Sequence, residues 1–206
     1  MSVNKFNKFG KDGIILGLLG LCAIGAIAFF ILSTNNGRSI IDVISGNASI
    51  TLKGPESLNV NNRDEFIVDV VVEHLPNQDY PAASLSISFD NNYLEFTGIR
   101  QGNMRTVGNR PGTYSIPFWE SDLVVANERG LINTMYLDMS GGDHPYIIDD
   151  NTILLRLAFR LKDSVSVGNS LDIHIEDAVF ATNQAENSVS IQEGNLRGND
   201  ASIIIE

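Results

Sequence analysis

The chain has 206 residues, a hydrophobic content of 43% and a formal net charge of −11 at pH 7. This length accommodates one domain of ordinary size with an appendage, and the hydrophobic content is sufficient for a buried core. The acidic balance argues against binding to nucleic acid and against docking on anionic lipid headgroups, because both carry negative charge.

The first predicted element is a membrane-spanning helix that begins at Gly13 and ends at Leu32. The segment contains no charged residue. A helix of this length, at about 1.5 Å per residue, spans roughly 30 Å, the thickness of the hydrocarbon core of a bilayer. Three lysines precede it, whereas Arg38 is the sole nearby cation after it. The positive-inside rule therefore predicts a single-pass protein of the cell membrane, with residues 1–12 in the cytoplasm and an extracellular C-terminal domain.

A cleaved signal peptide is the alternative for this segment. Signal peptides usually have an apolar region of about 7–15 residues that ends in a small-x-small cleavage site. Here the apolar region is longer and ends in Phe29-Phe30-Ile31-Leu32, which favours an uncleaved anchor. The surroundings of Cys22 faintly resemble a lipoprotein box, but the apolar run that follows favours a position inside the helix.

Residues 33–47 are predicted to form a linker, and residues 48–206 an all-β domain. Short segments of alternating or β-branched apolar residues are separated by Gly, Asn, Asp and Pro, and no sustained helical period occurs beyond residue 33. Many short strands with frequent turns indicate a sandwich or barrel. The expected strands are Ser49–Leu52, Phe66–Val72, Leu85–Phe89, Leu94–Ile99, Gly112–Pro117, Leu131–Met139, Ile153–Leu161, Ser170–Ile175, Val179–Thr182 and Ala201–Ile205.

The most informative segment runs from residue 80 to residue 98. Leu85, Ile87 and Phe89 alternate with serines, which is the period of a strand with one buried face. Asp90-Asn91-Asn92 then supplies turn residues, and a second apolar period starts at Leu94.

The order of these segments resembles a cohesin domain. Residues 85–96 (LSISFDNNYLEF) are similar to the family's strand, aspartate turn and following strand, and residues 153–161 (ILLRLAFRL) resemble a later strand. The resemblance covers residues 48–206 and implies a nine-stranded jelly-roll β-sandwich, related to carbohydrate-binding modules. It also implies a non-catalytic module that captures a calcium-loaded dockerin-type protein for assembly at the cell surface.

The resemblance further implies a binding face. In type I cohesins, dockerin is held on one sheet face, partly by an Asn and an Asp on the strand before the aspartate turn. Ala82 and Ser84 occupy those positions here, and neither offers a carboxylate or carboxamide acceptor. On a later strand, Met135 and Asp138 match an apolar and an acidic contact. The expected partner-binding residues are Ala82, Ser84, Ser86, Ser88, Met135 and Asp138.

Binding of polysaccharide by the same sandwich is the alternative function. Trp119, with Tyr114 near it, is the best candidate for an aromatic platform that stacks on sugar rings, and a packing role in the core is the rival interpretation of this tryptophan. A structural, pilin-like subunit is a third interpretation, disfavoured because the apolar helix lacks the acidic residue that pilins usually carry near its start.

Motifs for catalysis and metal binding are missing from the sequence. His74, His144 and His174 lack the spacing of a zinc site, and His174 is expected to face solvent. No nucleophile elbow, phosphate-binding loop or dinucleotide fingerprint occurs. The acidic run Asp149-Asp150-Asn151 lacks the alternating ligand spacing of a calcium loop. We therefore predict no enzymatic activity, no cofactor and no bound metal.

Overall fold

A computed structural model of the chain describes residues 48–206 except 77, 108–113, 116–117, 139–145 and 148–150. The predicted cytoplasmic segment, the membrane span over 13–32 and the linker over 33–47 lie outside the described residues. Within the described part of the chain, no helix has both the length and the apolar character needed to cross a membrane.

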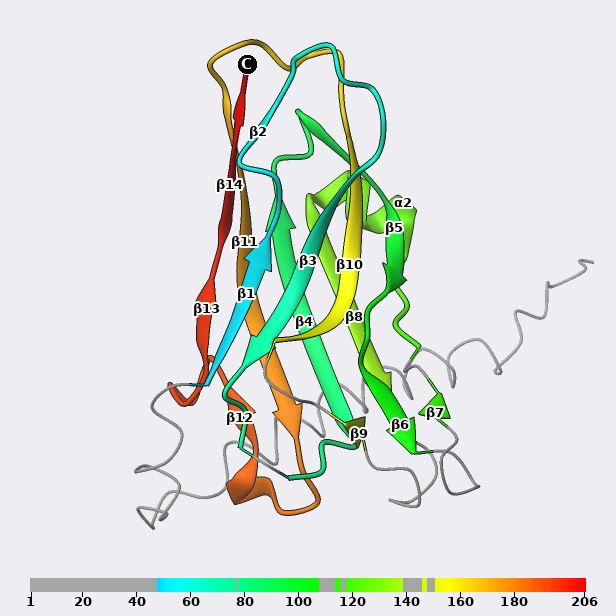
Figure 1. The fold of residues 1–206 in the computed structure, drawn as a ribbon, viewed down its shortest axis with the longest axis vertical. Helices are drawn as coiled ribbons and strands as arrows, with labels where there is room; N and C mark the ends of the chain where they lie inside the picture. The colour runs from blue at the N-terminus through cyan, green and yellow to red at the C-terminus, as the bar shows by residue number, and fades with distance from the viewer. Residues whose placement is uncertain (1–47, 77, 108–113, 116–117, 139–145, 148–150) are drawn as a thin grey trace, which may run out of the picture. The chain divides into compact units, whose positions relative to one another are not determined.

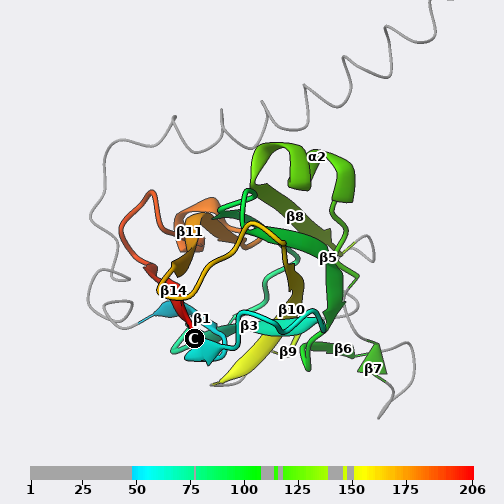
Figure 2. The same cartoon turned by 90° about the horizontal axis from the view of Figure 1, so that it is seen from above.

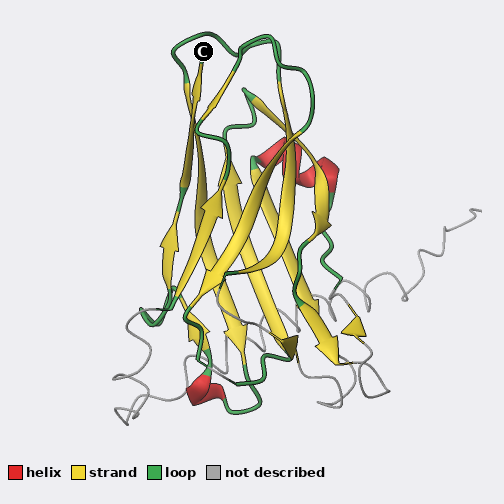
Figure 3. Ribbon diagram, in the orientation of Figure 1, coloured by secondary structure: helices red, strands yellow, loops and turns green. Residues whose placement is uncertain are grey.

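Two β-sheets packed face to face form the domain (Figures 1 and 3). The first sheet has the order β13 (Arg197–Asn199), β1 (Ser49–Lys53), β3 (Phe66–Glu73), β10 (Thr152–Leu161), β5 (Leu94–Gln101). The second has the order β2 (Ser57–Leu58), β14 (Ala201–Ile205), β11 (Ser170–Ala181), β4 (Ala82–Phe89), β8 (Leu131–Leu137), and β12 (Val189–Ser190) also pairs with β11. A small third sheet contains β7 (Tyr114–Ser115), β6 (Arg105–Val107) and β9 (Tyr146–Ile147).

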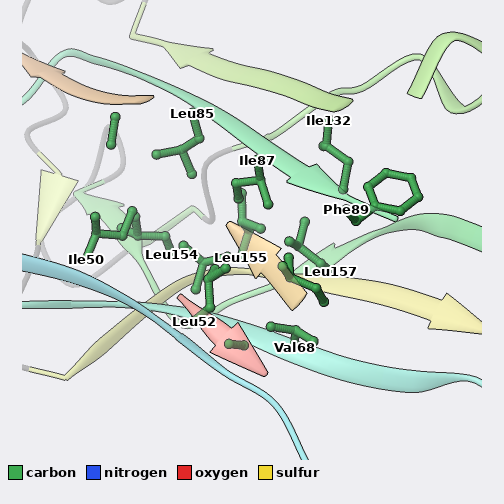
Figure 4. Close-up of a cluster of buried hydrophobic side chains, with 14 of the residues drawn as sticks. Ile50, Leu52, Val68, Leu85, Ile87, Phe89, Ile132, Leu154, Leu155 and Leu157 are labelled. Atoms are coloured by element: carbon green, nitrogen blue, oxygen red, sulfur yellow. The ribbon is translucent and has the colours of Figure 1, made fainter. Parts of the chain in front are cut away.

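The core lies between the two main sheets, and the alternation along the strands produces it. In β4 every second side chain is buried, including Leu85, Ile87 and Phe89. The opposite sheet contributes Leu155 and Leu157 of β10, which are fully buried. Figure 4 shows these side chains meeting between the ribbons. Burial of each such side chain contributes about 1.5–3 kcal/mol to folding, so this layer holds the sheets together.

The predicted all-β sandwich is confirmed, but the expected number of nine strands is wrong. Among the described residues, the two main sheets contain eleven strands. The C-terminal segment changes sheets at Asp200, because β13 pairs with β1 in the first sheet while β14 pairs with β11 in the second. Strands β2 and β12 have only two residues each, too few to show a periodicity. The two segments expected at 170–175 and 179–182 form one strand, β11, interrupted by a bulge.

A helix that the sequence analysis did not expect, α2 (Leu123–Arg129), packs against β5 and β8, the edge strands of the two sheets (Figure 2). Asp122 caps its N-terminus by accepting a hydrogen bond from the Val125 N–H at 3.0 Å. Gly130 ends it in the left-handed conformation, with φ 64°. With seven residues the helix completes about two turns, too few for a sustained period. A single-turn 3-10 helix, η2 (Ala185–Asn187), lies between β11 and β12.

Candidate functional site

The outer face of the second sheet, opposite the core, is the surface on which the predicted binding residues of β4 lie. Ala82, Ser84, Ser86 and Ser88 alternate with the buried residues of this strand and are themselves half-buried, because β8 and β11 flank them on both sides. Ser86 Oγ donates a hydrogen bond of 2.7 Å to Asn133 on β8. The four predicted residues therefore share one surface, built from small side chains.

One end of this face is apolar. Met135 and Leu137 of β8 lie there with side chains that are 52% and 60% exposed. The register places them directly beside Ser84 and Ala82. On the other side of β4, the pairing with β11 places Val179 beside Ser84 and Ala181 beside Ala82. We call this set the apolar half: Ala82, Ser84, Met135, Leu137, Val179 and Ala181.

The other end of the face is acidic. Ser88 Oγ donates a hydrogen bond to Glu176 Oε1, and Gln192 Nε2 donates one of 3.0 Å to Asp177 Oδ2. Both acids lie at the bulge of β11, where the register shifts between Ile175 and Asp177. Asp172 of β11 and Asp200, which lies between β13 and β14, are close to His174 of β11. We call this set the acidic half: Asp172, Glu176, Asp177 and Asp200.

His174 links the acidic half to the C-terminal segment. Its Nδ1 lies 2.9 Å from Asp200 Oδ2, and the other oxygen of this carboxylate accepts a hydrogen bond from the Ile175 N–H. The hydrogen bond to Asp200 is the largest cause of the raised pKa of His174; burial is the second and lowers this pKa, and the charges of Asp200, Asp172 and Glu176 raise it further. The side chain is 52% exposed, which confirms the prediction of a surface histidine.

The structure joins Asp138 through its backbone to the start of β4 and adds one residue to the predicted set. Asp138 follows the end of β8, and its backbone N–H donates to Pro81 O. The exposed neighbour of Met135 along the strand is Leu137, two residues away, and the alternation of β8 alone could have indicated it. The residues of β11 carry no such local signal, because only the pairing with β4 brings them to this face.

Trp119 lies in the core instead of forming a platform. Its side chain is 93% buried, with 7% exposed, and its ring meets Tyr136 edge-on at a centroid distance of 4.8 Å. It borders a hollow of about 630 Å³ that is lined by β5, by the segment before α2 and by Asn133. The other aromatic of the alternative site, Tyr114, lies in β7 of the small third sheet. A ring buried to this extent does not favour stacking on sugars.

Acidic side chains in the described part of the chain do not assemble a metal site. No group of three or more His, Cys, Asp or Glu residues there is placed to hold an ion. In the acidic run considered above, residues 149 and 150 lie outside the described residues, and Asn151 has a positive φ of 62°.

Comparison with solved structures shows the same fold. The OlpA cohesin of Clostridium thermocellum, in a type I complex with the dockerin Doc918, superposes with a TM-score of 0.58 at 15% identity, covering 77% of this chain and 99% of that one. The OlpC cohesin of the same organism, in complex with Doc435, gives 0.57 at 14% identity over 84% and 98%. A non-cellulosomal cohesin from the archaeon Archaeoglobus fulgidus gives 0.51 at 17% identity over 77% and 91%.

Comparison with protein families gives the assignment. A search of curated proteins finds no match to the chain. The sequence model of the family described as Cohesin domain matches residues 48–195, most of the chain and nearly all of the sandwich. The resemblance expected from residues 80–98 is thereby confirmed, and the chain belongs to the cohesin domain family.

Proposed function

We propose that the chain is a non-catalytic receptor that captures a dockerin-type protein on the outer face of its second sheet. The main support is the apolar half of that face, where Met135 and Leu137 are more than half exposed beside the small residues Ala82 and Ser84. Exposed apolar side chains next to small ones let a partner surface approach closely and bury apolar area. The solved OlpA and OlpC cohesins, which share the fold, are in complex with dockerins.

The proposal is tested by binding of dockerins to the full chain in detergent micelles. A panel of calcium-loaded dockerin modules, including Doc918 and Doc435, is measured by surface plasmon resonance with and without chelator. We expect at least one module to bind, and Leu137→Asp to weaken its binding by about tenfold or more, because the substitution places a charge in the apolar contact.

Val167→Asp is the matched control, since Val167 is 67% exposed and lies between β10 and β11, outside the outer face. We expect this variant to bind like the unchanged chain. Failure of every module to bind, or equal loss in the two variants, would contradict the proposal.

We also propose that residues 13–32 anchor the protein in the cell membrane and that residues 48–206 are extracellular. The support is the uncharged apolar segment and the excess of lysine before it. Extraction of membranes at alkaline pH should leave the full chain in the pellet, and deletion of residues 13–32 should release it. Protease added to intact cells should remove the sandwich; protection of the sandwich would show the opposite orientation.

A further inference from the structure

The second sheet differs from the first in its charged residues. None of its strands contains Lys or Arg, whereas β11 alone contains three acids, Asp172, Glu176 and Asp177. All three are partly or fully exposed, and Asp200 adjoins them through His174. The outer face therefore carries negative charge at one end and no Lys or Arg on any strand.

Three of the four acids in the acidic half accept hydrogen bonds from neutral side chains, and the fourth, Asp200, pairs with His174. Ser88, Gln192 and Ser170 donate hydrogen bonds to Glu176, Asp177 and Asp172, respectively. Elsewhere in the described residues, Lys and Arg form ion pairs with acids. None of these pairs includes a strand residue of the second sheet. The pairs are Lys53–Glu73, Arg63–Asp163, Arg100–Glu65 and Arg156–Asp69. The acidic half is thus hydrogen-bonded, while its charge is not neutralised by Lys or Arg in any of these ion pairs.

The two halves of the face lie one after the other along β4. Ser84 pairs with Met135 in the apolar half, and Ser88 contacts Glu176 in the acidic half. Ser88 lies four positions after Ser84, which corresponds to about 13 Å along the strand at the usual rise. Ala82 and Ser84 are not strong hydrogen-bond acceptors. The charged acceptors of this face lie on β11 and not on β4.

From this arrangement, and resting on the proposed function, we infer that the partner surface carries Lys or Arg side chains about 13 Å from an apolar patch. The acidic half selects these cations and fixes the orientation in which the partner docks. Charge complementarity of this kind increases the rate of association and disfavours partners with negative charge at the same place. A partner with an apolar patch but without Lys or Arg beside it would contact only the apolar half.

Selection from a library tests the inference directly. The calcium-loaded Doc918 module, randomised at its surface residues, is displayed and selected for binding to the full chain in detergent micelles. We expect Lys and Arg to be enriched among the binders, and Glu176→Gln with Asp177→Asn to slow association of these binders about tenfold and to reduce its salt dependence. Both substitutions preserve side-chain size, and each amide keeps one oxygen that accepts a hydrogen bond, so the fold is expected to persist, as a thermal unfolding curve would show.

The control replaces two acids away from the face, Glu95→Gln on β5 with Asp64→Asn before β3, and should leave association unchanged. In a reciprocal experiment, a selected binder with Lys→Glu should lose affinity for the unchanged chain and recover it with Glu176→Lys. Binders without enriched Lys or Arg, or binders insensitive to the Glu176 and Asp177 substitutions, would overturn the inference while the proposed function stands. A library that yields no binder would overturn the proposed function and this inference together.

Discussion

His174 gives the outer face a histidine whose pKa is raised. Its pKa in the folded chain lies above the ordinary histidine value of 6.5 because of the hydrogen bond to Asp200 and the neighbouring carboxylates. A raised folded-state pKa means that the interaction stabilises the fold fully below about pH 6.5, and that this contribution is lost as the pH rises through the raised value. We therefore expect Asp200→Asn to destabilise the chain more at pH 5.5 than at pH 8.5.

The measurement is an NMR titration of the His174 ring together with thermal unfolding at the two pH values. In Asp200→Asn the amide oxygen can still accept the hydrogen bond from the Ile175 N–H, so the variant removes the charge and the hydrogen-bond acceptor that face His174. The pKa of His174 should move down toward its ordinary value. An unchanged pKa, or equal destabilisation at both pH values, would show that Asp200 does not control this histidine.

Trp119 and Phe118 are adjacent residues with opposite environments, 7% and 75% exposed. Trp119→Ala removes a large ring from the core beside Tyr136 and should lower the free energy of unfolding by about 3–5 kcal/mol. Phe118→Ala should change it by about 0.5 kcal/mol or less, since surface substitutions are usually small. Urea denaturation measures both. Unchanged stability of the Trp119→Ala chain would contradict the core position of this ring and would favour its alternative role as a platform for sugar binding.

At the scale of elements, one side chain of α2 attaches the helix to the edge of β5. Asn127 accepts a hydrogen bond from the Phe96 N–H and donates one to the Phe96 carbonyl, both at 2.8 Å, and so imitates a neighbouring strand at the edge of β5. Asn127→Ala should lower the free energy of unfolding by about 1–3 kcal/mol, because two part-buried backbone groups lose their partner. The exchange rate of the Phe96 amide proton should rise. Glu128→Ala, exposed on the same helix, is the control and should leave both quantities nearly unchanged.

The elements differ in how far the sequence could predict them. β4 and β3 were predicted because alternation or β-branched residues extend over most of a strand, and this local signal is sufficient. The helix α2 was missed, although Asp122 before it and Gly130 after it are the cap residues that mark helix ends. The attachment of Asn127 to Phe96 joins residues 31 apart in sequence, and no local pattern encodes such a contact.

At the scale of the whole molecule, the sequence indicates which residues of a strand face outward but not which strands lie side by side. The serines of β4 and Met135 of β8 were assigned to one face correctly. The acidic half was not, because Glu176 and Asp177 reach this face only through the pairing of β11 with β4 and through a bulge that shifts the register. The charge pattern of this face is therefore a property of the assembled sheet.

The stability of the whole sandwich is expected to be independent of calcium. Its core is one continuous cluster of apolar side chains from both main sheets, and the chain has a single cysteine, so no internal disulfide contributes. In the described part of the chain, no acidic cluster is placed to hold an ion. Thermal unfolding of the full chain should thus show the same Tm with calcium and with chelator.

The same chelator should abolish capture of a dockerin, because the resemblance to cohesins assigns the calcium to the partner. Calorimetry of the chain alone and binding to the calcium-loaded module, measured in the same buffers, separate the two effects. A Tm that falls on chelation would place a calcium site on this chain, contrary to the prediction. Asp149→Asn with Asp150→Asn would then show whether the acidic run is that site, since loss of its ligands should remove the dependence of Tm on calcium.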